Sequence, residues 1–218
     1  MFMGLVGSEM CIRDRNGYSV LFEKMLKPII PYTVKGAIWY QGESNVGNYN
    51  EYQELFSGMI EDWRETWGYD FPFYYAQIAP FIYSPTENSQ GLRDAQRKTL
   101  ESTSNTGMAI LMDIGEKDDI HPHNKQDVGK RLALLALDND YNFDIISSGP
   151  IYKNHTISGK FLYVDFNSKG SGLKFINGKN GFEISGEDNK FYEAIAEIVD
   201  NKIRIYSNQV KNPKNIRY

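Results

Sequence analysis

The fold is decided by residues 34–79, which read VKGAIWYQGESNVGNYNEYQELFSGMIEDWRETWGYDFPFYYAQIA. The apolar runs 34–41 and 71–79 predict two buried strands. Between them, apolar side chains recur every three or four residues over Asn48–Trp67, which predicts a helix packed through one face. Gly68 follows as its expected C-cap. This strand-helix-strand order predicts two parallel strands in one sheet.

The same alternation continues outward from this unit. Further segments predict a short helix before it, then a helix, a strand and a helix after it, at residues 20–29, 92–100, 108–114 and 124–137. The chain therefore predicts an α/β domain with a parallel sheet. Ligands of such sheets bind beyond the carboxyl ends of the strands.

The pattern changes after residue 142. Short alternating runs separated by Asn, Asp and Gly turns predict an all-β module over residues 143–218. Asp200-Asn201 lies between two such runs and predicts a hairpin. We therefore expect two domains, 16–142 and 143–218.

Residues 1–15 do not follow these patterns. Val6–Arg15 resembles translated sequencing-adapter DNA, and we expect the segment 1–15 to be foreign to the natural protein. The natural chain is then expected to extend upstream of Asn16.

Composition excludes several classes of protein. The 218 residues have a net charge of -4, which does not favour a nucleic-acid partner. No apolar run reaches the length of a membrane span. The one cysteine, Cys11, excludes an internal disulfide framework. The 14% aromatic content suits either a sugar-stacking surface or β-rich packing.

The first candidate site follows the strand 34–41 and contains Gln41, Gly42, Glu43, Ser44 and Asn45. Ser44 as a nucleophile is disfavoured, because the nucleophile elbow needs glycine two residues later and the chain has valine there. Amide side chains and backbone N–H groups could instead hold an oxyanion. An ordinary β-α turn remains an equally simple interpretation.

The second candidate is the segment around His121. A histidine with Asp118 or Asp119 just upstream suits a base that a carboxylate orients. A metal site formed by His121, His123 and an aspartate is an alternative, although two-residue spacing across Pro122 fits it badly. A solvated loop before a helix is the plainest interpretation.

The third candidate is Arg93. It could orient a carboxylate such as Glu43 or contact a substrate. A charge on the surface of a helix is the alternative.

Three blocks together resemble the sialate O-acetylesterases, carbohydrate esterases of the SGNH hydrolase superfamily. They occur in the family's order within about Tyr18–Tyr152. The blocks are AIWYQGESN at 37–45, LRDAQ at 92–96 and DIHPHNKQ at 119–126.

The resemblance implies a partial flavodoxin-like, three-layer SGNH domain followed by a partial β-sandwich-like module. It implies a serine esterase that removes acetyl groups from sugars such as sialic acid through an acetyl-enzyme, without a cofactor. His121 is then the base, with Asp119 as orienter and Asp118 as its alternative. An O-acetylated sugar is the expected partner, and an extracellular or periplasmic location is expected for the parent protein.

The resemblance also assigns the first candidate site. Gln41 and Gly42 are the expected oxyanion donors. Glu43 and Arg93 are expected to form a supporting ion pair, with Ser44 and Asn45 beside them.

The chain departs from the family at the nucleophile. The family's serine lies in a Gly-Gln-Ser-Asn block on the first strand, and no such block occurs here. We expect that strand, the serine and an export signal to lie upstream, and the chain itself to be inactive. The alternatives are a non-catalytic carbohydrate-binding or structural module, and a metal-dependent hydrolase that uses His121 and His123.

Overall fold

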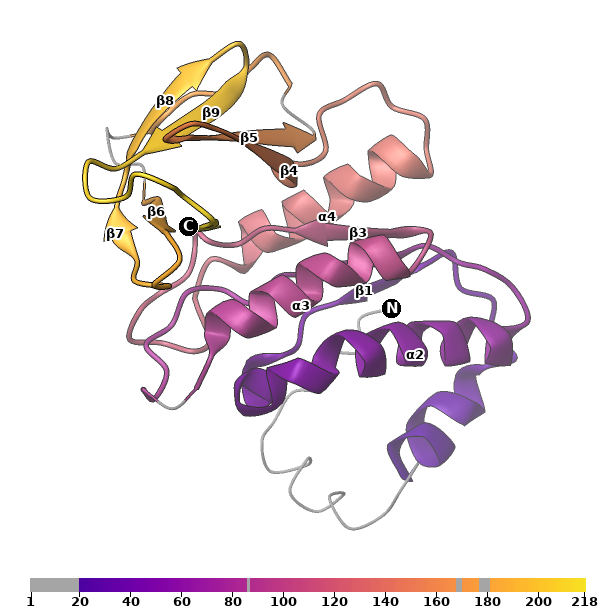
Figure 1. Ribbon diagram of the computed structural model, residues 1–218. Helices are drawn as coiled ribbons and strands as arrows, with labels where there is room; N and C mark the ends of the chain where they lie inside the picture. The colour runs from indigo at the N-terminus through magenta and orange to yellow at the C-terminus, as the bar shows by residue number, and fades with distance from the viewer. Residues whose placement is uncertain (1–19, 86, 168–169, 177–180) are drawn as a thin grey trace. The chain divides into compact units, whose positions relative to one another are not determined.

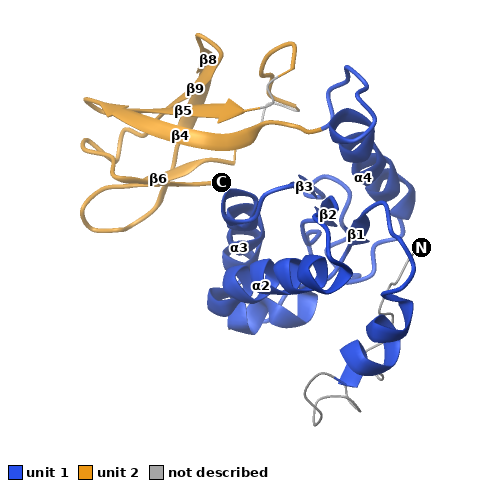
Figure 2. Cartoon of the chain, turned by 90° about the vertical axis from the view of Figure 1, so that its right-hand side faces the viewer, with its two compact units in different colours: residues 1–147 blue, residues 148–218 orange. Residues whose placement is uncertain are grey.

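The computed structural model describes residues 20–85, 87–167, 170–176 and 181–218. The chain forms two compact units, Met1–Ser147 and Ser148–Tyr218 (Figure 2). The sequence pattern predicts a domain boundary between residues 142 and 143, close to this division. The segment 1–15 lies outside the described residues. No helix in the described ranges is long and apolar enough to cross a membrane.

The first unit contains a parallel sheet in the order β1-β2-β3 (Figure 1). Ala37 pairs with Phe73, and Phe73 pairs with Thr106 on its other side. The predicted parallel pairing is therefore confirmed. The elements of this unit are η1 (Phe22–Leu26), η2 (Lys27–Ile29), β1 (Ala37–Trp39), η3 (Glu43–Asn48), α2 (Tyr49–Trp67), β2 (Phe73–Ala76), α3 (Ser89–Ser102), β3 (Thr106–Ala109) and α4 (Lys125–Asn139).

The three strands are shorter than the apolar runs that predicted them. Strand pairing ends where neighbouring strands no longer overlap, while burial continues into the loops, as at Ile78 and Leu111. Apolar runs therefore mark the buried segment rather than the paired one. The predicted helix 20–29 is also altered, since it is a π-helical turn followed by a 3-10 turn with Pro28 near its start.

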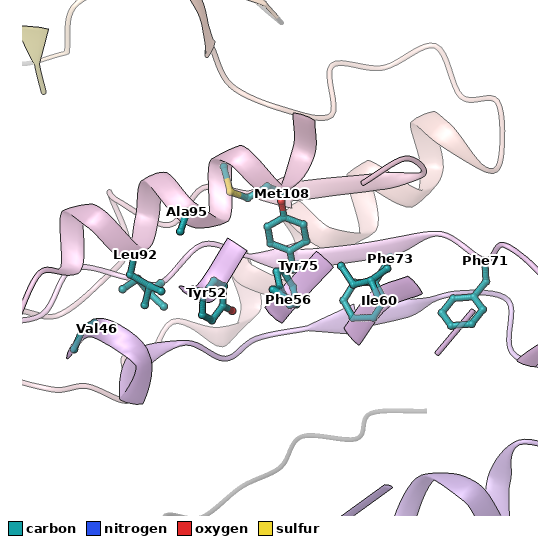
Figure 3. Close-up of a cluster of buried hydrophobic side chains, with 11 residues drawn as sticks. Val46, Tyr52, Phe56, Ile60, Phe71, Phe73, Tyr75, Leu92, Ala95 and Met108 are labelled. Carbon is teal, nitrogen blue, oxygen red and sulfur yellow. The ribbon is translucent and has the colours of Figure 1, made fainter. Parts of the chain in front are cut away.

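Helix α2 covers one face of the sheet, beside α3. Figure 3 shows its inward side chains Tyr52, Phe56 and Ile60 packed with Phe73 and Tyr75 of β2. Aromatic rings meet edge to face here, with the Phe56 and Tyr75 centroids 5.0 Å apart. This helix is the element that the sequence periodicity predicted most directly.

Gly68 ends α2 as predicted. Its φ of 80° is left-handed, and its N–H donates to the carbonyls of Arg64 and Glu65.

Helix α4 covers the opposite face. Alternate residues of β2 point to opposite sides of the sheet, so Tyr74 and Ala76 pack with Val128, Leu132 and Leu135 of α4. The unit therefore has three layers, with α2 and α3 on one side of the sheet and α4 on the other. This confirms the predicted α/β class.

A buried arginine joins α2 to the starts of the strands. Arg64 Nε donates to the carbonyl of Phe71 at 3.0 Å, and its Nη1 and Nη2 donate to the carbonyls of Ser104 and Asn105 at 2.9 and 2.8 Å. Nε also lies 2.9 Å from the Asp70 carboxylate. The side chain thus fixes the amino ends of β2 and β3 against α2.

The second unit is antiparallel. One sheet has the order β4-β5-β9-β8 and the other β10-β6-β7, and a shared core fills the space between them. Asp200 and Asn201 join β8 to β9 with φ of 51° and 56°, so the predicted hairpin is confirmed. The strands are β4 (Ile151–Ser158), β5 (Phe161–Asn167), β6 (Glu183–Ser185), β7 (Tyr192–Glu193), β8 (Ile195–Val199), β9 (Lys202–Tyr206) and β10 (Asn215–Arg217).

Candidate active site

The predicted site residues come from three loops of the first unit. Gln41–Asn45 follow β1, Arg93 lies on α3 after the loop that leaves β2, and Asp118–His123 lie between β3 and α4. Parallel strands place their carboxyl ends at one edge of the sheet. The fold therefore brings the sequence-predicted blocks to the same end of the domain.

The Gln41 side chain is held by its neighbours. Its Nε2 donates to Asn45 Oδ1 at 2.7 Å. The Tyr52 hydroxyl lies 3.2 Å from the Gln41 carbonyl oxygen and 3.4 Å from Oε1. One amide hydrogen of Gln41 is used by Asn45, so the other could serve an oxyanion. Gln41 and Asn45 thus act as one unit.

Gly42 occupies a backbone conformation that favours glycine. Its φ is 148°, and a Cβ there would lie 3.0 Å from Ile78 Cγ2 and 3.3 Å from Gln96 Nε2. Its carbonyl accepts a bond from the Asn45 N–H at 2.7 Å. The tight turn that starts η3 therefore depends on glycine at this position.

Gln96, the last residue of the block LRDAQ, is a site residue that the sequence did not predict. Its side chain has no exposed surface. Oε1 accepts from the Ile78 N–H at 2.9 Å, and Nε2 lies 3.4 Å from the carbonyl oxygens of both Gln41 and Ala76. One amide thus ties the loop after β1 to the end of β2. A glutamine at a core-facing helical position was the signal that could have identified it.

Glu43 is partly buried, and the charge of the candidate base His121 acts on it. Burial raises the pKa of its carboxyl, while the backbone N–H groups of Glu43 and Gly42 and the charges of Lys125 and His121 act in the opposite direction. The expected ion pair with Arg93 does not form within the described residues. Instead Arg93 Nη2 donates to Ser89 Oγ at 3.1 Å.

Ser44 is exposed in η3, and the structure shows no hydrogen bond between it and His121 in the part of the chain that it describes. Val46 is buried where the nucleophile elbow would need glycine. The local geometry gives no support to Ser44 as a nucleophile.

His121 and Asp119 are neighbours through the backbone. Asp119 Oδ1 accepts from the His121 N–H at 2.7 Å, and the His121 ring has no hydrogen-bond partner among the described residues. Asp118 is exposed and lies 3.8 Å from Lys117 Nζ. Neither aspartate orients the imidazole here. Glu43 is a carboxyl on which the charge of His121 acts.

A possible cation site lies in the same loop. Ligand atoms of Glu116, Asp119 and His123 lie within 4.8 Å of one another. Hydrogen bonds from the backbone N–H and the ring of His123 lower the pKa of Glu116. Two carboxylates and an imidazole could hold a divalent cation. This group does not include His121, so it differs from the metal alternative that the sequence suggested.

A groove in the first unit lies elsewhere. About 850 Å³ of space separates residues 22–30 from α2, lined by side chains that include Leu26, Met59 and Trp63. None of the candidate residues lines it. It therefore contains none of the predicted catalytic groups.

Residues 6–138 match the family described as carbohydrate esterase, sialic acid-specific acetylesterase. The chain belongs to this family. The family resemblance that the three sequence blocks suggested is therefore confirmed. The match begins inside the segment 1–15, whose foreign origin stays a prediction.

Individual relatives agree with this esterase family. Sialate O-acetylesterases of Pongo abelii and Homo sapiens are each 35% identical over 140 residues, which cover 55% of this chain and 27% of theirs. A carbohydrate acetylesterase from Xanthomonas citri is 37% identical, with a TM-score of 0.84 over 91% of this chain and 48% of its own. The chain thus spans about a quarter of the curated esterases and half of the bacterial one.

Proposed function

We propose that the chain is the base-bearing part of a serine carbohydrate O-acetylesterase that acts on O-acetylated sugars such as sialic acid. The membership of residues 6–138 in the acetylesterase family carries this proposal. The three family blocks meet at the carboxyl end of the parallel sheet, which is where α/β domains bind ligands.

In the proposed reaction, a serine oxygen attacks the acetyl carbonyl carbon and His121 accepts the serine proton. The sugar oxygen leaves with a proton returned by His121, and water then hydrolyses the acetyl-enzyme to acetate. Gln41 and Gly42 donate hydrogen bonds to the oxyanion. No cofactor enters this scheme.

The serine is expected from a Gly-Gln-Ser-Asn block, which this sequence does not contain. We therefore propose that another segment of the parent protein supplies it, and that the parent is extracellular or periplasmic. The orienter of His121 is Asp119 in this proposal, with Asp118 as alternative. Closure of the complete site would turn the Asp119 carboxylate from the backbone to the ring, since catalytic bonds often tighten only with substrate bound.

The test compares two histidines of one loop in the full-length parent protein. His121→Ala should lower kcat on an O-acetylated sialic acid by about 10³-fold or more, whereas His123→Ala should change it less than about 5-fold. Asp119→Asn and Asp118→Asn then identify the orienter. Melting curves establish that each variant is folded.

The metal alternative predicts different results. A hydrolase that uses the Glu116, Asp119 and His123 group would lose activity with a chelator and with His123→Ala, and would resist a serine-directed phosphonate. The serine esterase resists the chelator and is inactivated by the phosphonate. Saccharide binding without turnover, indifferent to His121→Ala, would indicate the non-catalytic module.

A further inference from the structure

Three buried polar atoms beside the candidate active site have no hydrogen-bond partner among the described residues. They are Tyr40 Oη, Tyr83 Oη and Arg93 Nη1. A buried donor without a partner costs about 1–3 kcal/mol, and more when it is charged. Three such atoms at one place therefore call for a ligand.

The three side chains form one group. Tyr40 follows β1, Tyr83 lies in the loop after β2, and Arg93 lies in the second turn of α3. Tyr83 interacts electrostatically with both Tyr40 and Arg93. Tyr40 packs against the core on the α4 side of the sheet and Tyr83 against the core on the α2 side. The group thus spans the sheet at its carboxyl end.

The two tyrosines present hydroxyl donors over the whole physiological range. Burial, followed by the charge of Glu43, raises the pKa of each phenol to about 12. Both stay protonated near neutral pH, so each can donate one hydrogen bond to a ligand.

The guanidinium of Arg93 is already oriented. Its Nη2 donates to Ser89 Oγ at 3.1 Å, and the backbone carbonyl of Arg93 accepts from Gln77 Nε2 at 3.1 Å. No carboxylate of the described chain lies within ion-pair distance of it. A fixed cation with a buried, unpaired donor suits an anion that arrives from outside.

A second cation lies at the same place. Lys125 Nζ lies 4.7 Å from the Tyr40 ring centroid, and its charge acts on Glu43. Arg93 and Lys125 thus bring two positive charges to the group, while the charges of Glu43 and Glu87 also act on Tyr83. The guanidinium of Arg93, which no carboxylate of the described chain pairs, is the charge left to attract a monoanionic ligand.

We propose that Tyr40, Tyr83 and Arg93 form a recognition site for the carboxylate of an acidic sugar. The proposal rests on the proposed function, because the carboxylate would belong to the sugar whose acetyl ester is cleaved. Two hydroxyl donors and one guanidinium donor match the acceptors of a planar carboxylate. All three side chains are only partly buried as wholes, so the group lies near the surface of the unit.

The test measures binding and needs no turnover. Isothermal titration of the 218-residue chain compares N-acetylneuraminic acid with its methyl ester, which lacks the charge. The acid should bind about 10-fold more tightly or better. Arg93→Gln should remove this preference, so that the acid and its methyl ester bind with similar affinity. Tyr83→Phe, which keeps the ring, should weaken binding of the acid about 5-fold.

Arg97→Gln is the matched control. Arg97 lies one turn further along α3 and is paired at the surface with Asp94 and Glu101 at 2.9 and 2.5 Å. The Arg97→Gln variant should bind the acid with the same affinity as the unchanged chain. Acetate and inorganic phosphate, titrated alone, should bind more weakly than the sugar acid.

Several outcomes would overturn the proposal. The proposal is wrong if the acid and the ester bind equally, or if the acid does not bind. It is also wrong if Arg93→Gln and Tyr83→Phe both keep the preference for the acid. If Arg93→Gln does not fold, Tyr83→Phe and Tyr40→Phe decide. If the chain prefers the acid over the ester but the parent protein has no esterase activity, the proposed function is refuted and the carboxylate site is still supported.

Discussion

The amide of Gln96 binds the backbone carbonyl of Gln41 across 55 residues of sequence, with Nε2 and the oxygen 3.4 Å apart. The same side chain accepts a bond from the Ile78 N–H. A fully buried side chain thus sets the spacing of two loops at the candidate site. Loss of this side chain should therefore destabilise the first unit.

Gln96→Leu should lower the free energy of unfolding of the first unit by about 2–4 kcal/mol, because it removes the acceptor of the buried Ile78 N–H and a donor to the carbonyls of Ala76 and Gln41. Urea unfolding followed by tryptophan fluorescence measures this unit alone, since all three tryptophans lie in it. The control Gln90→Leu changes an exposed residue of the same helix. Equal midpoints for the two variants would show that the Gln96 bonds do not stabilise the fold.

Gly42→Ala should destabilise the first unit by about 1–3 kcal/mol. Residues with a side chain rarely adopt its φ of 148°, and a Cβ there would lie 3.0 Å from Ile78 Cγ2, which would have to move. Gly58→Ala is the control of opposite sign, because it lies in α2 with no atom within 4 Å of the added carbon. It should stabilise the helix by about 0.5–1 kcal/mol. A Gly42→Ala variant as stable as Gly58→Ala would contradict the strained conformation.

Glu43→Gln should change how stability depends on pH. Burial raises the folded pKa of this carboxyl above its ordinary value of 4.5, so the folded state holds the proton where the unfolded state has lost it. Stability is then full below the unfolded pKa and falls as the pH rises through the folded pKa. The variant should lack this loss and be the more stable protein at neutral pH.

The melting temperatures of the Glu43→Gln variant and of the unchanged chain are measured between about pH 3.5 and about pH 8. The difference curve is the melting temperature of the unchanged chain minus that of the variant at each pH. Glu54→Gln, at an exposed position of α2, is the control. If the melting temperature of the unchanged chain rises with pH relative to that of the variant, the raised pKa of Glu43 is refuted.

Arg64→Lys should cost about 2–3 kcal/mol of unfolding free energy despite the retained charge. A lysine ammonium cannot reach the carbonyls of Phe71, Ser104 and Asn105 together, as the guanidinium does. Urea midpoints from tryptophan fluorescence measure the loss. Arg97→Lys, whose partners are exposed carboxylates, should shift the midpoint much less.

Regular elements were predictable where one periodicity runs over many residues. The apolar stripe of α2, its stop at Gly68 and the hairpin turn at Asp200-Asn201 all follow from local rules. The ends of β2 were not predictable, because strand length depends on the overlap with β1 and β3, which no local pattern records.

The candidate site was predictable as a set of blocks but not as a geometry. The sequence could not show that Arg93 is bonded to Ser89 rather than to Glu43, or that Asp119 binds the His121 backbone rather than its ring. Tyr83 carried no sequence signal, since its proximity to Tyr40 arises only when two loops meet across the sheet. Contacts between loops depend on tertiary packing, which single-sequence patterns do not contain.

The order β1-β2-β3 places each strand beside the one that precedes it in the chain. Every pairing in this sheet therefore closes a loop of one helix and its connections, without waiting for a distant segment. Such sequence-local topology favours rapid folding, and it lets the sheet grow strand by strand as the chain emerges from the ribosome. The hydrogen bonds of Gln96 need β1, β2 and α3 together, so during synthesis they can form once α3 has emerged and before β3 joins the sheet.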